Sequence, residues 1–182
     1  MSANESGELL QHADEASDAC ETYVCASAAA YRRLAGRLPG PDDVVIEIGA
    51  STGKATKRLA ARAGRVIAVE HSDEMLELAR AALEGADNVT LLKADAWDLG
   101  PVLNETSRAD CVFVDIAGSA PPWSTLRLAE RYRTQFRPRC LVIRNTRLAG
   151  FVSGGRFCVG AVGRGGGCGG QECPPARGEV CG

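Results

Sequence analysis

A glycine-containing turn follows the first strongly apolar run of the chain, and its composition suits a ligand that the backbone approaches closely. Residues 47–54 read EIGASTGK. Gly49 and Gly53 permit tight turning and close packing. Glu47 can accept hydrogen bonds from the turn or hold a cationic amino group. We therefore predict that a small ligand is bound here by Glu47, Gly49, Ala50, Ser51 and Gly53.

Two phosphate-binding patterns compete for the same turn, and neither fits. A P-loop requires four residues between its glycines, but Gly49 and Gly53 are one residue too close. A dinucleotide-binding turn requires glycines where this chain has Ser51 and Lys54. The acidic Glu47 would also repel a pyrophosphate. The turn therefore favours a ligand without a pyrophosphate.

Acidic residues also end the next two apolar runs. Glu70, followed by His71, lies about 20 residues after the turn, where dinucleotide-binding folds place the acceptor for a ribose diol. Alternatively, Glu70 only caps a strand. Asp95 can accept a hydrogen bond from an adenine amine beside the backbone of Ala96, or form an ordinary turn. Trp97 either shields the ring or fills the core. The three strand ends together predict a nucleoside site.

The fourth apolar run ends in Asp115, which we take as the candidate catalytic residue. It can orient a nucleophile, act as a base or assist a metal, or it can simply cap a turn. We assign no metal ligands. Arg144 and Arg147 follow the fifth run and can contact an anionic substrate, although solvated charges at a sheet edge are the favoured interpretation.

The apolar runs alternate with amphipathic segments. The runs are continuously apolar, which is typical of parallel strands covered by helices on both faces. The expected strands are residues 44–46, 66–69, 89–92, 111–114 and 140–143. The expected helices lie around residues 55–60, 72–83 and 126–132. This alternation predicts an α/β fold, a doubly wound and mainly parallel Rossmann-like sheet.

One further helix is expected before the first strand. Val24, Ala28, Tyr31, Ala35 and Leu38 recur at helical spacing, and the Pro-Gly-Pro sequence of residues 39–41 forbids continuation. We expect an amphipathic helix that ends near Leu38, packs on a sheet edge and flanks the site.

The sequences VVIEIGASTGKAT, VIAVEHS and NVTLLKADAWD resemble the first three motifs of class I S-adenosyl-L-methionine-dependent methyltransferases. The resemblance covers about residues 20–148 and implies S-adenosyl-L-methionine as the cofactor. It implies that Glu47 and the turn 49–53 face the methionine moiety, Glu70 the ribose hydroxyls, and Asp95 with Ala96 the adenine. Ser51 departs from the family pattern, which most often has a second glycine there.

The three motifs are especially similar to those of ribosomal RNA adenine dimethylases, but the fourth segment is not. Residues 115–122 read DIAGSAPP, without the aromatic residue that stacks on a flipped base or the amide that orients its amine. The stretch VDIA is closer to fibrillarin-like ribose methyltransferases, yet residues 145–147 lack their lysine. The methyl acceptor is left open between a small molecule and RNA. The alternatives are a non-catalytic S-adenosylmethionine-binding module and an aminopropyl transferase on the same fold.

The composition fits one globular domain without an overall basic field. The chain has 182 residues, 45% of them hydrophobic, and a formal net charge of -2. A nucleic-acid partner is neither required nor excluded. Since no apolar run is long enough to span a membrane and the acidic start lacks a secretory signal, we expect no membrane partner. The expected location is cytoplasmic, with an organelle stroma also open, and the oligomeric state is undetermined.

We divide the chain into a flexible leader (1–17), an S-adenosylmethionine-binding methyltransferase domain (18–150) and a Gly/Cys-rich disordered tail (151–182). The tail holds 11 of the 21 glycines, and its cysteines fit no common zinc pattern. Reduced core residues are expected at Cys20, Cys25, Cys111 and Cys140. Because family members usually end with an antiparallel strand pair and the tail shows no hairpin, the fifth predicted strand is expected to be an exposed edge.

Overall fold

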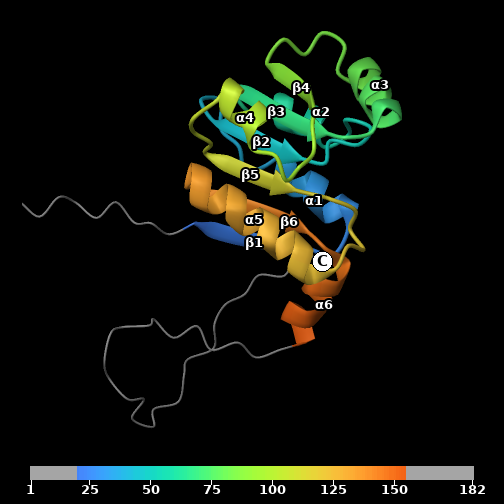
Figure 1. The fold of residues 1–182 in the computed structure, drawn as a ribbon, viewed down its shortest axis with the longest axis vertical. Coiled ribbons are helices and arrows are strands. Elements are labelled where there is room, and N and C mark those ends of the chain that lie inside the picture. The colour runs from blue at the N-terminus through green and yellow to red at the C-terminus, as the bar shows by residue number, and fades with distance from the viewer. Residues whose placement is uncertain (1–19, 155–182) are drawn as a thin grey trace, which may run out of the picture.

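Six parallel strands form the central sheet of the protein (Figure 1). The structure, a computed structural model, describes residues 20–154, so the leader and nearly all of the predicted tail lie outside the described residues. The strands are β1 (Glu21–Cys25), β2 (Val44–Ile48), β3 (Arg65–Glu70), β4 (Val89–Lys93), β5 (Cys111–Val114) and β6 (Cys140–Arg144). Their order is β1-β6-β5-β2-β3-β4, and every pairing is parallel. The predicted fold class and all five predicted strands are confirmed.

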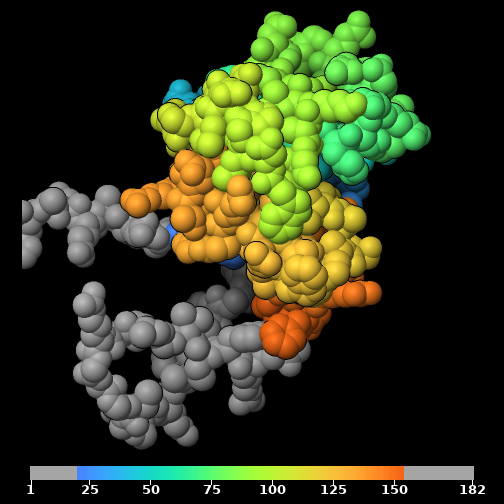
Figure 2. All heavy atoms as spheres, viewed as in Figure 1, coloured from blue at the N-terminus to red at the C-terminus, as the bar shows by residue number. Residues whose placement is uncertain are grey.

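Helices cover both faces of the sheet. Within the described part of the chain they are α1 (Ala28–Ala35), α2 (Thr56–Ala60), α3 (Asp73–Ala82), α4 (Gly100–Glu105), α5 (Pro122–Phe136) and α6 (Thr146–Gly154). Side chains of the α4 and α5 regions cover the face that is turned to the viewer in Figure 2, while α1 and α2 lie behind the sheet. The helices α4 and α6 were not predicted. None of these helices is long and apolar enough to cross a membrane.

Successive residues of each strand point into two different cores, as the two-residue period of a strand requires. The core under α1 and α2 contains Val45, Ala68, Phe113 and Val142, with Tyr31 and Leu59 from the helices. The core under α4 and α5 contains Ile46, Ile67, Val112 and Ile143, with Leu128 and Tyr132. The strand period then places four charged side chains on the α1 and α2 side of the sheet, at its carboxyl end: Glu47, Glu70, Asp115 and Arg144.

The segment before the first predicted strand corrects one expectation. Residues 21–25 form the strand β1, and α1 begins only after Ser27, whose hydroxyl accepts a hydrogen bond from the Ala30 N–H at 3.2 Å. The helix ends at Ala35, before Leu38. The predicted helix from Val24 to Leu38 was therefore wrong at both ends, because apolar residues at helical spacing continued across a strand and a turn.

β1 also covers the edge that was expected to be exposed. It pairs with β6 along its whole length, from Glu21 opposite Cys140 to Cys25 opposite Arg144. The expectation of an exposed fifth predicted strand, now β6, was wrong for this reason. In the described part of the chain, an N-terminal parallel strand therefore covers this edge of the sheet.

The local signals that delimit α3 and α5 are confirmed. The Ser72 hydroxyl caps α3 by accepting a hydrogen bond from Met75 N–H at 3.3 Å, and Gly85 adopts a left-handed φ of 78° after its end. α5 ends at Phe136, and its C-cap residue Arg137 directly precedes Pro138. The cysteines predicted as reduced residues are free thiols: Cys25, Cys111 and Cys140 are buried, and Cys20 is partly buried.

Candidate functional site

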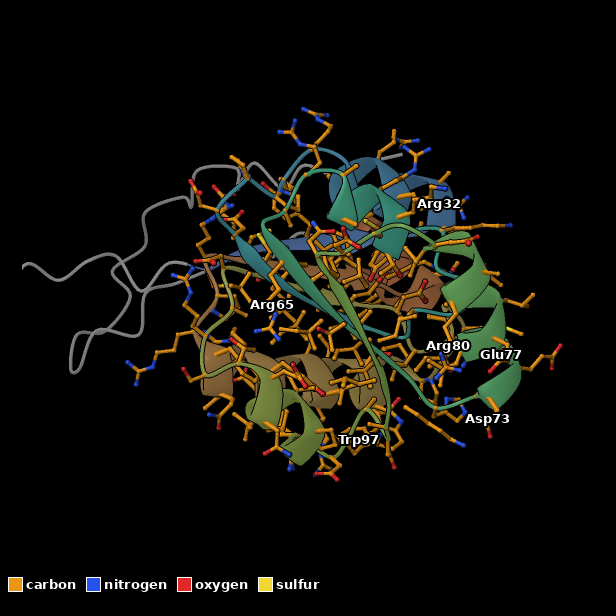
Figure 3. The ribbon with its side chains drawn as sticks, turned by 90° about the horizontal axis from the view of Figure 1, so that it is seen from above. Arg32, Arg65, Asp73, Glu77, Arg80 and Trp97 are labelled. Atoms are coloured by element: carbon orange, nitrogen blue, oxygen red, sulfur yellow. The ribbon has the colours of Figure 1, made fainter. Side chains whose placement is uncertain are left out.

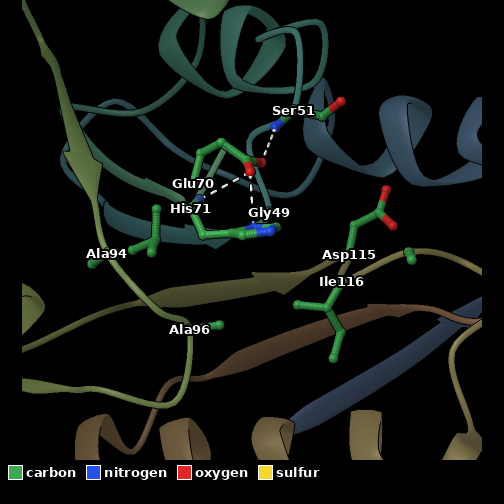
Figure 4. Close-up of a pocket in the computed structure, with 10 residues that line it drawn as sticks. Gly49, Ser51, Glu70, His71, Ala94, Ala96, Asp115 and Ile116 are labelled. Atoms are coloured by element: carbon green, nitrogen blue, oxygen red, sulfur yellow. Dashed lines mark hydrogen bonds and ion pairs between the residues drawn. The ribbon is translucent and has the colours of Figure 1, made fainter. Parts of the chain in front are cut away.

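A pocket of about 360 Å³ lies at the carboxyl ends of the central strands (Figure 4). It is lined by Gly49, Ser51, Val69, Glu70, His71, Ala94, Ala96, Asp115, Ile116 and Ala117. It lies where β2 and β5 are neighbours, which is the point at which the strand order reverses. Open α/β sheets bind ligands at such a point. Its size is within the range of small-molecule sites.

The Glu70 carboxylate organises one wall of this pocket. The residue is 7% exposed. Its Oε2 accepts a hydrogen bond from Ser51 N–H at 2.8 Å, and its Oε1 accepts from the N–H groups of His71 and Ser72, each at 2.9 Å. These bonds join the turn after β2 to the end of β3 (Figure 4). A carboxylate has about four acceptor positions, so Glu70 can also accept from a ligand.

Both glycines of the turn are required by its geometry. Gly49 has a φ of 90°, and a Cβ there would lie 2.1 Å from the Asp115 carbonyl oxygen. Gly53 has a φ of 74°, and a Cβ there would lie 3.2 Å from the Cα of Ala79 in α3. Left-handed backbone and close approach both favour glycine.

Ser51 takes the left-handed conformation without being glycine. Its φ is 49°, which costs roughly 1–2 kcal/mol for a residue that carries a Cβ. Its hydroxyl lies 3.8 Å from Met75 Sδ on α3, and its N–H reaches Glu70. Glycine would adopt this backbone without the strain, and the Glu70 bond holds the strained Ser51 in place.

Glu47 lies behind the turn and is 1% exposed. Its Oε2 accepts a hydrogen bond of 2.6 Å from the Thr56 hydroxyl at the start of α2. Burial raises the pKa of Glu47 to about 8; the Thr56 bond opposes this shift, and the charges of Asp115 and Glu70 add to it. Glu47 therefore titrates near neutral pH, and its contact with a ligand stays a prediction.

Asp115 and Arg144 form an ion pair at the opposite wall. Arg144 Nη1 lies 2.9 Å from Asp115 Oδ2, and the two side chains are 24% and 17% exposed. Burial raises the pKa of Asp115 to about 6, although Arg144 and Arg32 act to lower it. The interpretation of Arg144 as a solvated charge was wrong, because β5 and β6 are parallel neighbours that end side by side. Arg147 is exposed on α6.

The loop after β5 is held by the segment that follows β6. Asn145, fully buried, donates from Nδ2 to the Ala120 carbonyl at 2.9 Å, and Thr146 N–H donates to the Gly118 carbonyl at 2.8 Å. Asn145 N–H donates in turn to the Cys25 carbonyl of β1 at 3.0 Å. Ala117, in the pocket wall, has a left-handed φ of 65°. The shape of this wall thus depends on both β6 and β1.

The structure brings together six of the predicted site residues in the pocket wall: Gly49, Ser51, Glu70, His71, Ala96 and Asp115. The other four, Glu47, Ala50, Gly53 and Asp95, lie next to it and outside its lining. Ala50 donates its N–H to the Val69 carbonyl at 3.0 Å. Asp95 is exposed, and its Oδ1 accepts a hydrogen bond from Trp97 N–H at 2.9 Å.

Sequence reasoning missed the apolar members of the wall: Val69, Ala94, Ile116 and Ala117. Val69, Ala94 and Ile116 each adjoin a residue that was singled out, and Ala117 lies two residues after Asp115; this proximity is the signal that could have identified them. Thr56 was also missed, because nothing in its spacing links it to Glu47. Tyr132, far away in sequence, positions Ala96 by donating its hydroxyl to the Ala96 carbonyl at 3.0 Å.

Comparisons with known proteins agree with this geometry. Residues 45–135, half of the chain, match the family described as "Methyltransferase domain". Ribosomal RNA small subunit methyltransferase A of Pelotomaculum thermopropionicum is 48% identical over 59 residues, 32% of this chain and 20% of that protein. Its counterpart in Moorella thermoacetica is 49% identical over 57 residues, or 31% and 20%. The chain thus matches about a fifth of the length of these relatives.

Among solved structures, a precorrin 8w decarboxylase of Methanobacterium thermoautotrophicum shares the fold. Its TM-score is 0.50 at 23% sequence identity, and the match covers 63% of this chain and 60% of that one.

Substitutions in the turn test its backbone requirements. Gly49→Ala should lower the free energy of unfolding by about 3 kcal/mol or more, because the added Cβ meets the Asp115 carbonyl and the φ is left-handed. Ser51→Gly should lower the free energy of unfolding by less than about 1 kcal/mol, or raise it. Glycine relieves the backbone strain of the folded state, but it also makes the unfolded chain more flexible. Urea unfolding measures both. Equal losses in the two variants would contradict this account of the turn.

The raised pKa of Glu47 predicts a pH dependence of stability. In the unfolded chain Glu47 loses its proton near its usual pKa of 4.5, whereas in the folded chain it keeps it to about pH 8. The contribution of Glu47 to the free energy of unfolding is therefore fully present below about pH 4.5. It declines as the pH rises to about 8, by up to about 1.4 kcal/mol per pH unit. Glu47→Gln should flatten the decline, leaving a residual slope from Asp115 below about pH 6. Urea unfolding across this range, with Asp95→Asn as the control, measures it; an unchanged slope in Glu47→Gln would refute the assignment.

Proposed function

Because the chain belongs to the methyltransferase domain family, the class I S-adenosyl-L-methionine-dependent methyltransferases, we propose that its pocket binds S-adenosyl-L-methionine and that a methyl group is transferred there to an acceptor. The observation that carries this proposal is the buried Glu70 carboxylate, held in the pocket wall by the N–H groups of Ser51, His71 and Ser72. A buried acid in this place suits a neutral ribose diol, which donates hydrogen bonds, and disfavours a pyrophosphate.

The pocket residues fit the parts of this cofactor. Glu70 would accept from the ribose hydroxyls. Ala94, Ala96 and Ile116 supply an apolar wall for the adenine ring, with Asp95 at its edge. The turn at Gly49 would adjoin the methionine moiety, with Glu47 behind it. A cationic ligand would favour the ionised form of Glu47 and so offset part of the effect of its burial.

Methyl transfer requires the protein to align the reactants more than to supply acid or base catalysis. When bound, S-adenosyl-L-methionine supplies a methyl group that its sulfonium already activates. The chain's own residues then shield the site and orient the acceptor. Asp115 lies in the pocket wall, and its pKa of about 6 allows it to hold an acceptor hydroxyl or take up its proton near neutral pH. Arg144 fixes the direction in which that carboxylate points.

The acceptor is a small molecule or RNA. The names of the matched relatives, ribosomal RNA small subunit methyltransferases, favour RNA. The loop DIAGSAPP after β5 disfavours an adenine amine as the accepting atom, because it offers neither the stacking aromatic residue nor the orienting amide.

A second candidate function is a non-catalytic S-adenosylmethionine-binding module. The ion pair with Arg144 already engages Asp115, which favours this candidate, and the chain matches only about a fifth of the relatives' length. An aminopropyl transferase would bind the decarboxylated cofactor in preference.

Methyl transfer from labelled S-adenosyl-L-methionine separates these functions. The wild-type protein is expected to label an acceptor from an RNA and small-molecule panel. Asp115→Asn should reduce transfer while S-adenosylhomocysteine binding persists, because Asp115 would serve the acceptor and not the cofactor. Binding of S-adenosylhomocysteine without transfer to any acceptor would favour the binding module, and preference for the decarboxylated cofactor would favour the aminopropyl transferase.

The ribose contact of Glu70 is testable apart from its role in the turn. S-adenosylhomocysteine and its 2′-deoxy analogue are titrated by calorimetry into the wild type and Glu70→Gln. The wild type should bind the deoxy analogue about 1–3 kcal/mol more weakly, and Glu70→Gln should discriminate much less between the ligands. The control is Asp73→Asn, an exposed acid paired with Lys93. Equal weakening for both ligands in Glu70→Gln would mean that Glu70 only holds the turn.

A further inference from the structure

Two segments of the chain carry positive charge without any acidic residue. Residues 26–41 and 50–64 hold seven of the 21 lysines and arginines and no aspartate or glutamate, although the whole chain has a formal net charge of -2. The seven residues are Arg32, Arg33, Arg37, Lys54, Lys57, Arg58 and Arg62. We call this set the basic face.

The fold joins the two segments into one surface. α1 and α2 contact each other and cover the same core, and they lie side by side when the molecule is seen from above (Figure 3). Six members of the basic face are exposed, and Arg32 is partly buried. Arg58 reaches across from α2, with Nη1 about 4.0 Å from where a Cβ of Gly36 would stand at the end of α1.

At least four charges of this surface have no ion-pair partner among the described residues. No carboxylate of residues 20–154 forms an ion pair with Arg37, Lys54, Lys57 or Arg62. The described acids near it stand at its borders: Asp42 precedes β2, and Glu84 and Asp87 line a groove beside Lys57. Like charges gathered without counter-charges repel one another, and a bound polyanion would remove that repulsion.

The basic face adjoins the pocket. The turn 49–53 is at once a wall of the pocket and the entry to α2. Arg32 is close enough to Asp115 to act on the pKa of its carboxyl. A polymer bound along α1 and α2 therefore passes the mouth of the pocket.

From these observations we propose that the basic face binds the phosphate backbone of RNA and brings the acceptor nucleotide to the pocket. The proposal rests on the methyltransferase function and narrows its acceptor to RNA. Five of the seven residues are arginines, whose planar guanidinium groups donate paired hydrogen bonds to phosphate oxygens. Phosphate contacts of this kind supply affinity and position without reading sequence.

An anionic membrane surface fits the basic face less well. Helices that lie on membranes present apolar side chains beside their basic ones. The large apolar side chains that are exposed in residues 20–154 all lie on other elements: Leu78, Trp97, Leu103, Trp123, Leu126 and Phe151. A basic surface without large exposed apolar side chains is typical of nucleic-acid binding.

Salt-dependent RNA binding by matched variants tests the proposal. Binding of a short labelled single-stranded RNA is measured by fluorescence anisotropy at several salt concentrations. Three proteins are compared: the full chain, the basic-face variant Arg37→Gln/Arg62→Gln, and the control variant Arg127→Gln/Arg131→Gln. The last pair lies exposed on α5, on the opposite side of the sheet, and removes the same charge. The basic-face variant should bind more weakly and lower the slope of log affinity against log salt by about 1.4, or about 0.7 per lost phosphate contact. The α5 variant should match the wild type.

Three results would overturn the proposal: no RNA binding by the wild type, equal losses in the two variants, or preference for vesicles containing phosphatidylserine over RNA. Calorimetric titration with S-adenosylhomocysteine distinguishes failure of the RNA-binding proposal from failure of the proposed methyltransferase function. Unchanged cofactor binding in both variants, together with the selective RNA loss, supports the basic face as a separate acceptor surface. A wild type that binds RNA but no S-adenosylhomocysteine contradicts the proposed function and leaves RNA binding by the basic face supported.

Discussion

The hydrogen bonds of the Glu70 carboxylate connect every part of the candidate site. A buried carboxylate is costly unless its oxygens are bonded, and here three backbone N–H groups meet that need. The bond from Ser51 holds a residue whose backbone is strained, so the turn after β2 and the end of β3 form one unit. The position of Gly49 in this unit then determines how closely the loop that begins at Asp115 approaches, because no space is left for a side chain between them.

The two-residue period of the strands explains why the site carries so much charge. Glu47, Glu70, Asp115 and Arg144 all follow strand positions that face the core under α1 and α2. They therefore emerge at one end of the sheet and on one side of it, and the pKa values of Glu47 and Asp115 rise through burial there. At this end of the sheet the same strands place only apolar side chains in the opposite core, under α4 and α5. The ionisable groups of the site are thus concentrated beneath α1 and α2, which carry basic residues and no acidic ones.

Much of this arrangement was predictable from the sequence, and what was not has identifiable causes. Continuous apolar runs predicted five of the six described strands, β2 to β6, and the punctuation at Ser72 and Arg137-Pro138 marked two helix ends correctly. β1 was misassigned because Val24, Ala28 and Tyr31 keep a helical spacing across a strand and a helix. The Arg144 ion pair could not be read from spacing, because it depends on which strands become neighbours. The Thr56 bond to Glu47 depends on the exact course of the turn, which local sequence signals do not specify.

The pairing of β1 with β6 bears on how the domain assembles. The first strand of the described chain hydrogen-bonds to the last, so this contact closes a loop that contains all the other strands. Such distant contacts carry a large entropic cost of closure and form late in folding. During synthesis β1 has no partner until β6 has left the ribosome. The Asn145 bonds to Cys25 and Ala120 depend on the same closure. The wall around Asp115 is consequently completed only when β6 has joined the sheet, and the ligand-binding competence of the nascent chain awaits that pairing.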